Sequence, residues 1–105
     1  MPTKTIGGVT IDVTDDGFFT QPATWTEAMV PQLAADEGIA ELTEDHWQII
    51  KFMRAEYLEH GSGPPVRMLS KASGVGIKEL YRLFPKGPAK VAAKLAGIPK
   101  PRGCI

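Results

Sequence analysis

The most reactive side chain in the sequence is its only cysteine, Cys104, one residue before the last. The thiolate form is the nucleophile, and the nearby cations Lys100 and Arg102 favour it, although the terminal carboxylate opposes them. Gly103 removes side-chain bulk beside the sulfur. These features are typical of a sulfur that exchanges with the sulfur of a partner protein. An inert terminal cysteine is the alternative.

The segment that carries this cysteine is predicted to be an arm. Pro99 and Pro101 forbid a helix and favour semi-extended backbone, and the preceding helical pattern must end at Gly97. We therefore expect a helical domain over residues 1–96 and a mobile arm over residues 97–105. The prolines limit the arm's conformations, which lowers the entropy lost when it docks on a partner.

Composition excludes several classes of protein. With 105 residues, 43% of them hydrophobic, we expect one domain. No apolar run approaches the roughly 18 residues of a membrane span, and no secretory signal is visible. A single cysteine excludes an internal disulfide and is typical of the reducing cytoplasm. With only two histidines besides, no zinc-binding spacing exists, and we expect neither a metal nor a cofactor.

Charge is strongly segregated, although the formal net charge is zero. Residues 1–46 hold nine acids and one base, whereas residues 80–105 hold six bases and no acidic side chain. A basic terminal segment suggests an acidic protein surface, a nucleic acid or an anionic sulfur species as the partner. Because some of these lysines recur at a spacing of four, a solvated helix face is the alternative.

Turn residues and periodicity predict a mainly helical fold that begins with a β-hairpin. Residues 5–6 and 9–13 flank a glycine pair, the pattern of a two-residue hairpin. Thr43 is a good N-cap for a helix that runs to about residue 59 and is apolar over a wide arc. We expect this helix to be the central one, with His46 and His60 near its ends in capping or solvent-facing positions.

The remaining helices are shorter. One is expected around Pro31, since proline is tolerated near a helix start, and it should extend to about Asp36. Three more are expected over residues 66–72, 77–84 and 88–96. The predicted fold class is therefore mainly α: a small orthogonal helical bundle with an N-terminal β-hairpin, a helix-turn-helix-like pair and a flexible C-terminal arm.

Residues 66–84 carry the pattern of a helix-turn-helix, two short helices about a glycine turn. In a DNA reader, Lys78, Glu79, Tyr81 and Arg82 on the second helix would face the groove. The same shape arises from plain core packing, few bases accompany it, and the acidic N-terminal half would repel phosphate. A DNA-binding regulator is therefore kept as an alternative.

Four stretches resemble the DsrC/TusE family of sulfur-carrier proteins: LTEDHWQII at 42–50, PVRMLSKA at 65–72, YRLFPKGPAK at 81–90 and AGIPKPRGCI at 96–105. The resemblance covers nearly the whole chain in order, and its ending is highly specific. It implies a small helical domain with an N-terminal hairpin and a mobile arm. It also implies that Cys104 carries sulfur as a persulfide.

Two departures indicate a branch of this family. Members that serve dissimilatory sulfite reductase carry a second cysteine eleven positions before the first, where this chain has Ala93. Those members also tend to have an insertion in the loop at 74–77, which is short here. Both differences point to the TusE-like branch, which relays sulfur toward 2-thiouridine in tRNA. A Cys→Ala variant or a regulatory paralogue is the alternative.

The resemblance also implies partners and roles. We expect an upstream sulfur-donor protein complex and a downstream thiouridylase or sulfite reductase, with tRNA involved indirectly and no membrane. Lys100 and Arg102 would steer the arm and stabilise the anionic sulfur. Arg67 is a candidate to receive the retracted arm, and a surface or helix-capping role fits it equally well. The protein would be a sulfurtransferase-type carrier and not a stand-alone enzyme. A partner subunit of dissimilatory sulfite reductase or of sulfur-oxidation proteins is the alternative.

Overall fold

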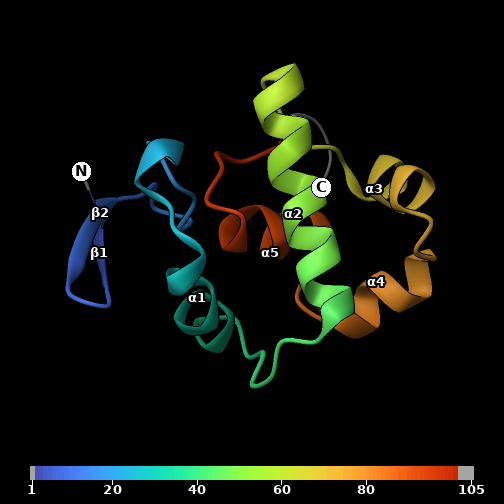
Figure 1. Cartoon of the computed structure of the whole chain (residues 1–105), viewed down its shortest axis with the longest axis horizontal. Helices are drawn as coiled ribbons and strands as arrows, with labels where there is room; N and C mark the ends of the chain where they lie inside the picture. The colour runs from blue at the N-terminus through green and yellow to red at the C-terminus, as the bar shows by residue number, and fades with distance from the viewer. Residues whose placement is uncertain (1, 102–105) are drawn as a thin grey trace.

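A computed structural model describes residues 2–101, so residues 1 and 102–105 lie outside the description. Within this range a two-stranded hairpin precedes five α-helices (Figure 1). The elements are β1 (Thr3–Ile6), β2 (Val9–Asp12), α1 (Val30–Asp36), α2 (Glu44–His60), α3 (Val66–Ser73), α4 (Ile77–Leu83) and α5 (Pro88–Leu95). Short 3-10 turns at Pro22–Thr24 and Glu27–Met29 lead into α1. The predicted mainly α fold with an N-terminal hairpin is confirmed. No helix in the described part of the chain is long and apolar enough to cross a membrane.

The hairpin is held against α1 at one edge of the molecule. Its antiparallel register pairs Ile6 with Val9 across the predicted glycine turn. Lys4 on β1 forms an ion pair with Asp36, with Nζ 2.7 Å from Oδ2, and Gln32 donates to the carbonyl of Thr5 at 3.2 Å. A lone hairpin is marginal in water, so this packing on a helix is what makes the hairpin stable.

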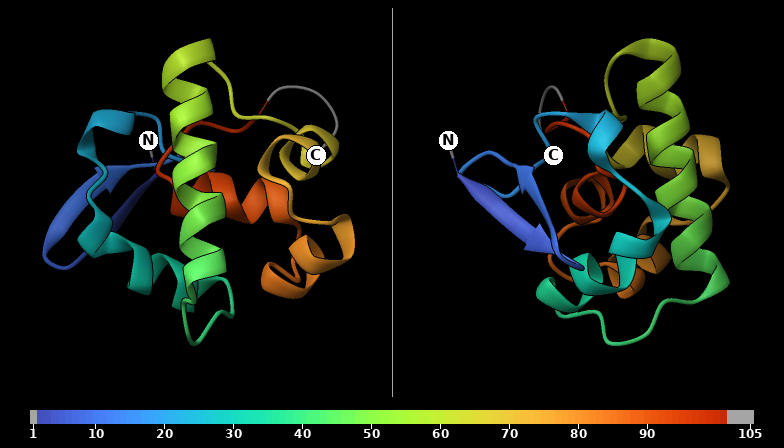
Figure 2. Two further views of the ribbon diagram at one scale, coloured as in Figure 1. Left: turned by 45° about the vertical axis from the view of Figure 1, so that its right-hand side comes forward. Right: turned by 60° about the vertical axis from the view of Figure 1, so that its left-hand side comes forward.

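The most enclosed helix is α5, which runs through the middle of the bundle behind α2 (Figure 2). It packs against α1, α2, α3 and α4. Six of its eight residues are buried: Pro88, Ala89, Val91, Ala92, Ala93 and Leu95. Helix α2 instead exposes Leu58 to 66%. The prediction that α2 is the central helix is therefore wrong. Alanine side chains are small, so neighbours can approach α5 from several sides at once.

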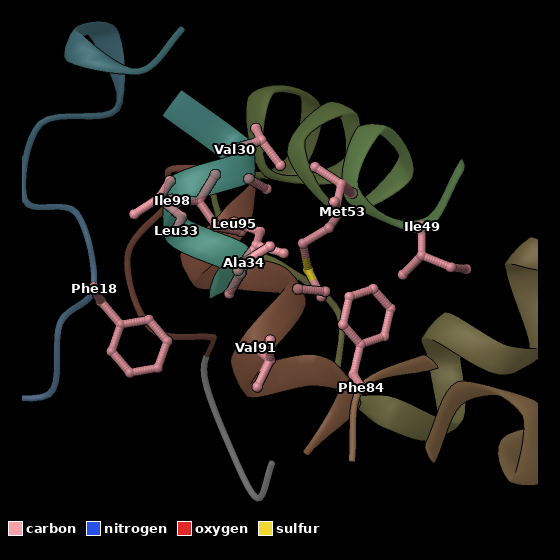
Figure 3. Close-up of a cluster of buried hydrophobic side chains, with 14 of the residues drawn as sticks. Phe18, Val30, Leu33, Ala34, Ile49, Met53, Phe84, Val91, Leu95 and Ile98 are labelled. Carbon is pink, nitrogen blue, oxygen red and sulfur yellow. The ribbon is translucent and has the colours of Figure 1, made fainter. Parts of the chain in front are cut away.

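Side chains from α1, α2, α5 and the segments that follow β2, α4 and α5 pack together in the core (Figure 3). Ile49 and Met53 of α2 point into this core, and Phe18 enters the same core from the loop after β2. Lys94 on α5 lies over the Phe18 ring, with Nζ 5.4 Å from its centroid. One continuous core of this kind makes the described residues a single folded unit.

Helix α2 begins with a capping box that uses a histidine. The Thr43 side chain accepts from the backbone N–H of His46, and the backbone N–H of Thr43 donates to His46 Nδ1 at 3.1 Å. His46 Nε2 lies 2.8 Å from the carbonyl oxygen of Leu83, an acceptor. The ring must therefore carry its proton on Nε2. The capping role predicted for His46 is confirmed, while its side chain is buried and not solvent-facing.

Replacement of His46 by alanine should destabilise the fold by about 2–4 kcal/mol, because it removes the cap and leaves the Leu83 carbonyl without its donor. The edge-on contact of the ring with Phe84, at 5.3 Å between centroids, is lost as well. Urea denaturation measures the free energy of unfolding. His60→Ala, at the exposed end of the same helix, should change it by less than about 1 kcal/mol. Equal decreases in the free energy of unfolding for His46→Ala and His60→Ala would contradict the capping role of His46.

The end of α5 fixes the direction of the following chain. Gly97 has φ +68°, its N–H bonds to the Lys94 carbonyl at 3.2 Å, and the N–H of Ile98 bonds to the Ala93 carbonyl at 3.1 Å. These two bonds define a Schellman motif, and Ile98 is fully buried beneath it. A Cβ at Gly97 would lie only 2.2–2.5 Å from three carbon atoms of Trp25.

Gly97→Ala should therefore destabilise the protein by about 2–4 kcal/mol, from left-handed strain together with the clash against Trp25. Gly74→Ala is the matched control, because Gly74 also ends a helix, at φ +78°, but its Cβ would meet no atom within 4 Å. Urea denaturation should show that the control loses only about 1–2 kcal/mol. Equal decreases in the free energy of unfolding for the two variants would show that the contact with Trp25 does not matter.

Candidate functional site

The predicted site residues fall into two groups. Cys104, Arg102 and Gly103 lie outside the described residues. Lys100 is exposed and faces the turn after β2, where its Nζ lies 3.7 Å from Asp16 Oδ2. Arg67 is exposed on α3, and no hydrogen bond or ion pair holds it within the described residues. The structure therefore places the two described candidates on different elements and not in one cluster.

The first residues of the expected arm pack on the domain. Gly97, Ile98 and Pro101 are buried, whereas Lys100 points outward. The segment after α5 runs to the loop between α2 and α3 (Figure 2). At that loop a Cβ on Gly63 would lie 2.8 Å from Ile98 Cδ1 and 3.5 Å from Pro101 Cγ. The packed part of the chain thus extends past the predicted boundary at residue 96, and mobility of the residues after it stays a prediction.

Arg54 on α2 holds the backbone at the base of this segment, and the sequence analysis missed it. Its Nη1 donates to the Ala96 carbonyl at 2.9 Å, and its Nη2 donates to the Pro22 carbonyl at 3.1 Å. Its Cζ lies 4.3 Å from the centroid of the Trp25 ring, a cation–π distance. The Trp25 indole N–H donates to the Leu95 carbonyl at 2.8 Å. We call Trp25 and Arg54 the clamp.

The charge of Arg54 in the clamp is disfavoured by burial and favoured by the end of helix α5. Partial burial lowers the pKa of the Arg54 guanidinium from its ordinary value, and the nearby Tyr57 acts in the opposite direction. The Ala96 carbonyl belongs to the C-terminal end of α5, where the helix dipole favours a cation. The signal in the sequence was an arginine placed among the apolar residues of a core helix, directly after Met53.

Within residues 2–101, two ion pairs connect the basic C-terminal segment with the acidic N-terminal half of the chain. Lys94 Nζ lies 3.5 Å from Glu37 Oε1, and Lys100 pairs with Asp16 as described. Each pair joins a lysine of the basic C-terminal segment to an acid of the N-terminal half. The basic segment is therefore partly neutralised within the molecule.

The two helices predicted to make a helix-turn-helix-like pair are α3 and α4, which residues 74–76 join. Leu69 and Leu80 are fully buried, and Tyr81 is half exposed. Arg82 is bonded to Glu79 on the same helix, with Nε 2.7 Å from Oε1. This contact raises the pKa of Arg82 and lowers that of Glu79. One of the two bases predicted to face DNA is thus already paired.

Among the described residues, one group could share a cation. Oxygen atoms of Glu56 and Glu59 and a nitrogen of His60 lie within 4.8 Å of one another at the end of α2. His60 Nε2 is already 3.1 Å from Glu56 Oε2, so an internal pair accounts for the arrangement. The described residues therefore offer no reason to expect a bound cation at this end of α2.

Comparison with known sequences gives a consistent result. The family model described as DsrC like protein matches residues 5–105. The chain is 48% identical to the sulfurtransferase TusE of Yersinia pseudotuberculosis, over 93% of this chain and 96% of the relative. It is 42% identical, over the full length of both chains, to the protein named sulfite reductase, dissimilatory-type subunit gamma, of Nitratidesulfovibrio vulgaris.

Solved structures agree with this result. The crystal structure of dissimilatory sulfite reductase I contains a chain that matches with a TM-score of 0.88 and 40% identity, covering 99% of this chain and all of that chain. The oxidized gamma-subunit of the dissimilatory sulfite reductase from Archaeoglobus fulgidus matches with a TM-score of 0.86 and 38% identity, over 99% and 100% of the two chains. The protein therefore belongs to the DsrC-like family.

Proposed function

We propose that this protein is a sulfur-relay protein that carries sulfur as a persulfide on Cys104. One observation carries the proposal: the only cysteine is the penultimate residue of a chain that is 48% identical to a protein named sulfurtransferase. The thiol follows a base that is packed at Ile98 and Pro101. Such a thiol can be delivered to another protein without rearrangement of the core.

The transfer is a thiol–persulfide exchange. The Cys104 thiolate attacks the outer sulfur of a donor persulfide, a new S–S bond forms at Cys104, and the donor's S–S bond breaks. The donor leaves as a thiolate, so one sulfur atom moves and no external oxidant or reductant is consumed. The acceptor then repeats the exchange on the Cys104 persulfide. Arg102 and Lys100 would stabilise the anionic sulfur, and Lys100 would first have to leave Asp16.

The proposed destination of the sulfur is 2-thiouridine in tRNA, through a thiouridylase. Ala93 supports this branch, because it stands where the sulfite-reductase members of the family carry a second cysteine. It is fully buried on α5. With a single thiol, the chain can form neither an internal disulfide nor a trisulfide bridge. The absence of a disulfide also suits the reducing cytoplasm, the compartment that we propose.

A second candidate is a partner of a dissimilatory sulfite reductase that uses Cys104 alone. The 42% identity to a gamma subunit over the full length of both chains favours it. Its discriminating property is co-purification with a sirohaem enzyme. The missing second cysteine places it behind the sulfur-relay function.

Cys104→Ser should abolish sulfur loading without unfolding the domain, because serine lacks the thiol and is close to cysteine in size. Intact-protein mass is measured after incubation with a cysteine desulfurase, cysteine and candidate upstream carriers. The wild-type chain should gain one sulfur atom that dithiothreitol removes, and the variant should gain none.

The thermal transition of Cys104→Ser should match that of the wild type, which serves as the control for folding. Sulfur uptake by the Cys104→Ser protein would refute the assignment. So would a wild-type chain that takes up no sulfur from any donor in the panel.

A further inference from the structure

We propose that the groove between the end of α2 and the start of α3 is the surface on which the sulfur-donor protein docks, through a segment that is basic and apolar. Six residues line this groove, which has a volume of about 290 Å³: Glu56, His60, Ser62, Pro64, Pro65 and Met68. We call it the α2–α3 groove. The inference rests on the proposed sulfur-relay function and identifies the surface on which the donor binds before sulfur is transferred.

The first argument is the reach of Cys104. Pro101 is buried and lies close to Gly63, the residue between Ser62 and Pro64 of the groove. Three residues of fully extended chain span at most about 11 Å, so while Pro101 stays packed the Cα of Cys104 remains within that distance of Pro101. A donor must therefore bring its persulfide to the neighbourhood of this loop, and the surface that it meets includes the groove.

The second argument is the apolar character of the groove. Pro64 and Pro65 form a rigid part of its wall, and Met68 is 53% exposed. Methionine is flexible and polarizable, which suits a surface that must accept a partner's side chains. An exposed apolar side chain beside a concave, proline-lined surface is what a docking site offers.

The third argument is charge. Glu56 lines the groove and Glu59 adjoins it in the sequence, and in the described part of the chain neither carboxylate pairs with a lysine or an arginine. The group that faces them is the imidazole of His60, with Nε2 3.1 Å from Glu56 and 4.0 Å from Glu59. Negative charge of this kind favours a basic partner segment and speeds its association. A second copy of the chain is the competing occupant.

The test uses two groove variants and one matched control. Met68→Ala removes the exposed apolar side chain from the groove, in the first turn of α3, and leaves the charge unchanged. Glu56→Gln combined with Glu59→Gln removes the negative charge at the end of α2, where the helix dipole disfavours it anyway. Ile77→Ala is the control, because Ile77 is also an exposed apolar residue, at 44%, in the first turn of a short helix, and it does not line the groove.

Two rates are compared for each protein. The first is the second-order rate of persulfide transfer from the protein donor that loads the wild-type chain in the mass experiment above. The second is alkylation of Cys104 by iodoacetamide, which needs no docking. Met68→Ala should slow transfer about tenfold or more, as truncation of a central docking residue does, and leave alkylation unchanged. Ile77→Ala should change neither rate.

The double glutamine variant should slow transfer several-fold at low ionic strength and should lose most of the salt dependence shown by the wild type. Wild-type transfer rates in the groove variants would overturn the docking site alone. A parallel loss of alkylation would also overturn it, since the substitutions would then act on the thiol itself. So would sedimentation showing that the wild type is a dimer that Met68→Ala dissociates. If no donor loads the wild-type chain, the inference fails together with the proposed function.

Discussion

The structure depends on the hydrogen bonds that the last carbonyl groups of α5 accept. The last carbonyls of a helix have no partner within the helix, and burying them unpaired would be costly. Here the indole of Trp25 donates to the Leu95 carbonyl and the guanidinium of Arg54 donates to the Ala96 carbonyl. The same guanidinium bonds to Pro22 and lies over the Trp25 ring. One cluster thus ties the N-terminal region and α2 to the C-terminal end of α5.

The base of the terminal segment is part of the core, because α5 is enclosed and Ile98 is buried. The proposed persulfide would be on Cys104, three residues after the buried Pro101. Three residues of extended chain span at most about 11 Å, so while Pro101 stays packed a partner would have to meet the thiol near the loop between α2 and α3. The surface around that loop is therefore where we propose that the partner is recognised.

The segregation of charge along the chain has a different meaning in three dimensions. The basic C-terminal segment by itself suggested an anionic partner. In the folded molecule Lys94 and Lys100 face Glu37 and Asp16 from the acidic half. The exposed pair between Lys100 and Asp16 adds little to stability. Both pairs reduce the free positive charge of the basic segment. In the described part of the chain, by contrast, the carboxylates of Glu56 and Glu59 pair with His60 and with no lysine or arginine.

The sequence by itself was enough to predict the helices and the hairpin, and it made Cys104 the candidate reactive residue. Helix caps, turn glycines and prolines act locally, so the hairpin, the start of α2 at Thr43 and the entry of Pro31 into α1 could be predicted from neighbours in the chain. The family resemblance rested on four stretches of sequence, of which the ending around Cys104 is highly specific, and each stretch is also local. Only the tertiary structure decided that α5 is the enclosed helix, that Arg54 and Trp25 hold its end, and that Ile98 and Pro101 belong to the packed domain. These features join residues that are far apart in the chain, such as Trp25 and Leu95. They also depend on how closely the other helices can pack against the small alanine side chains of α5.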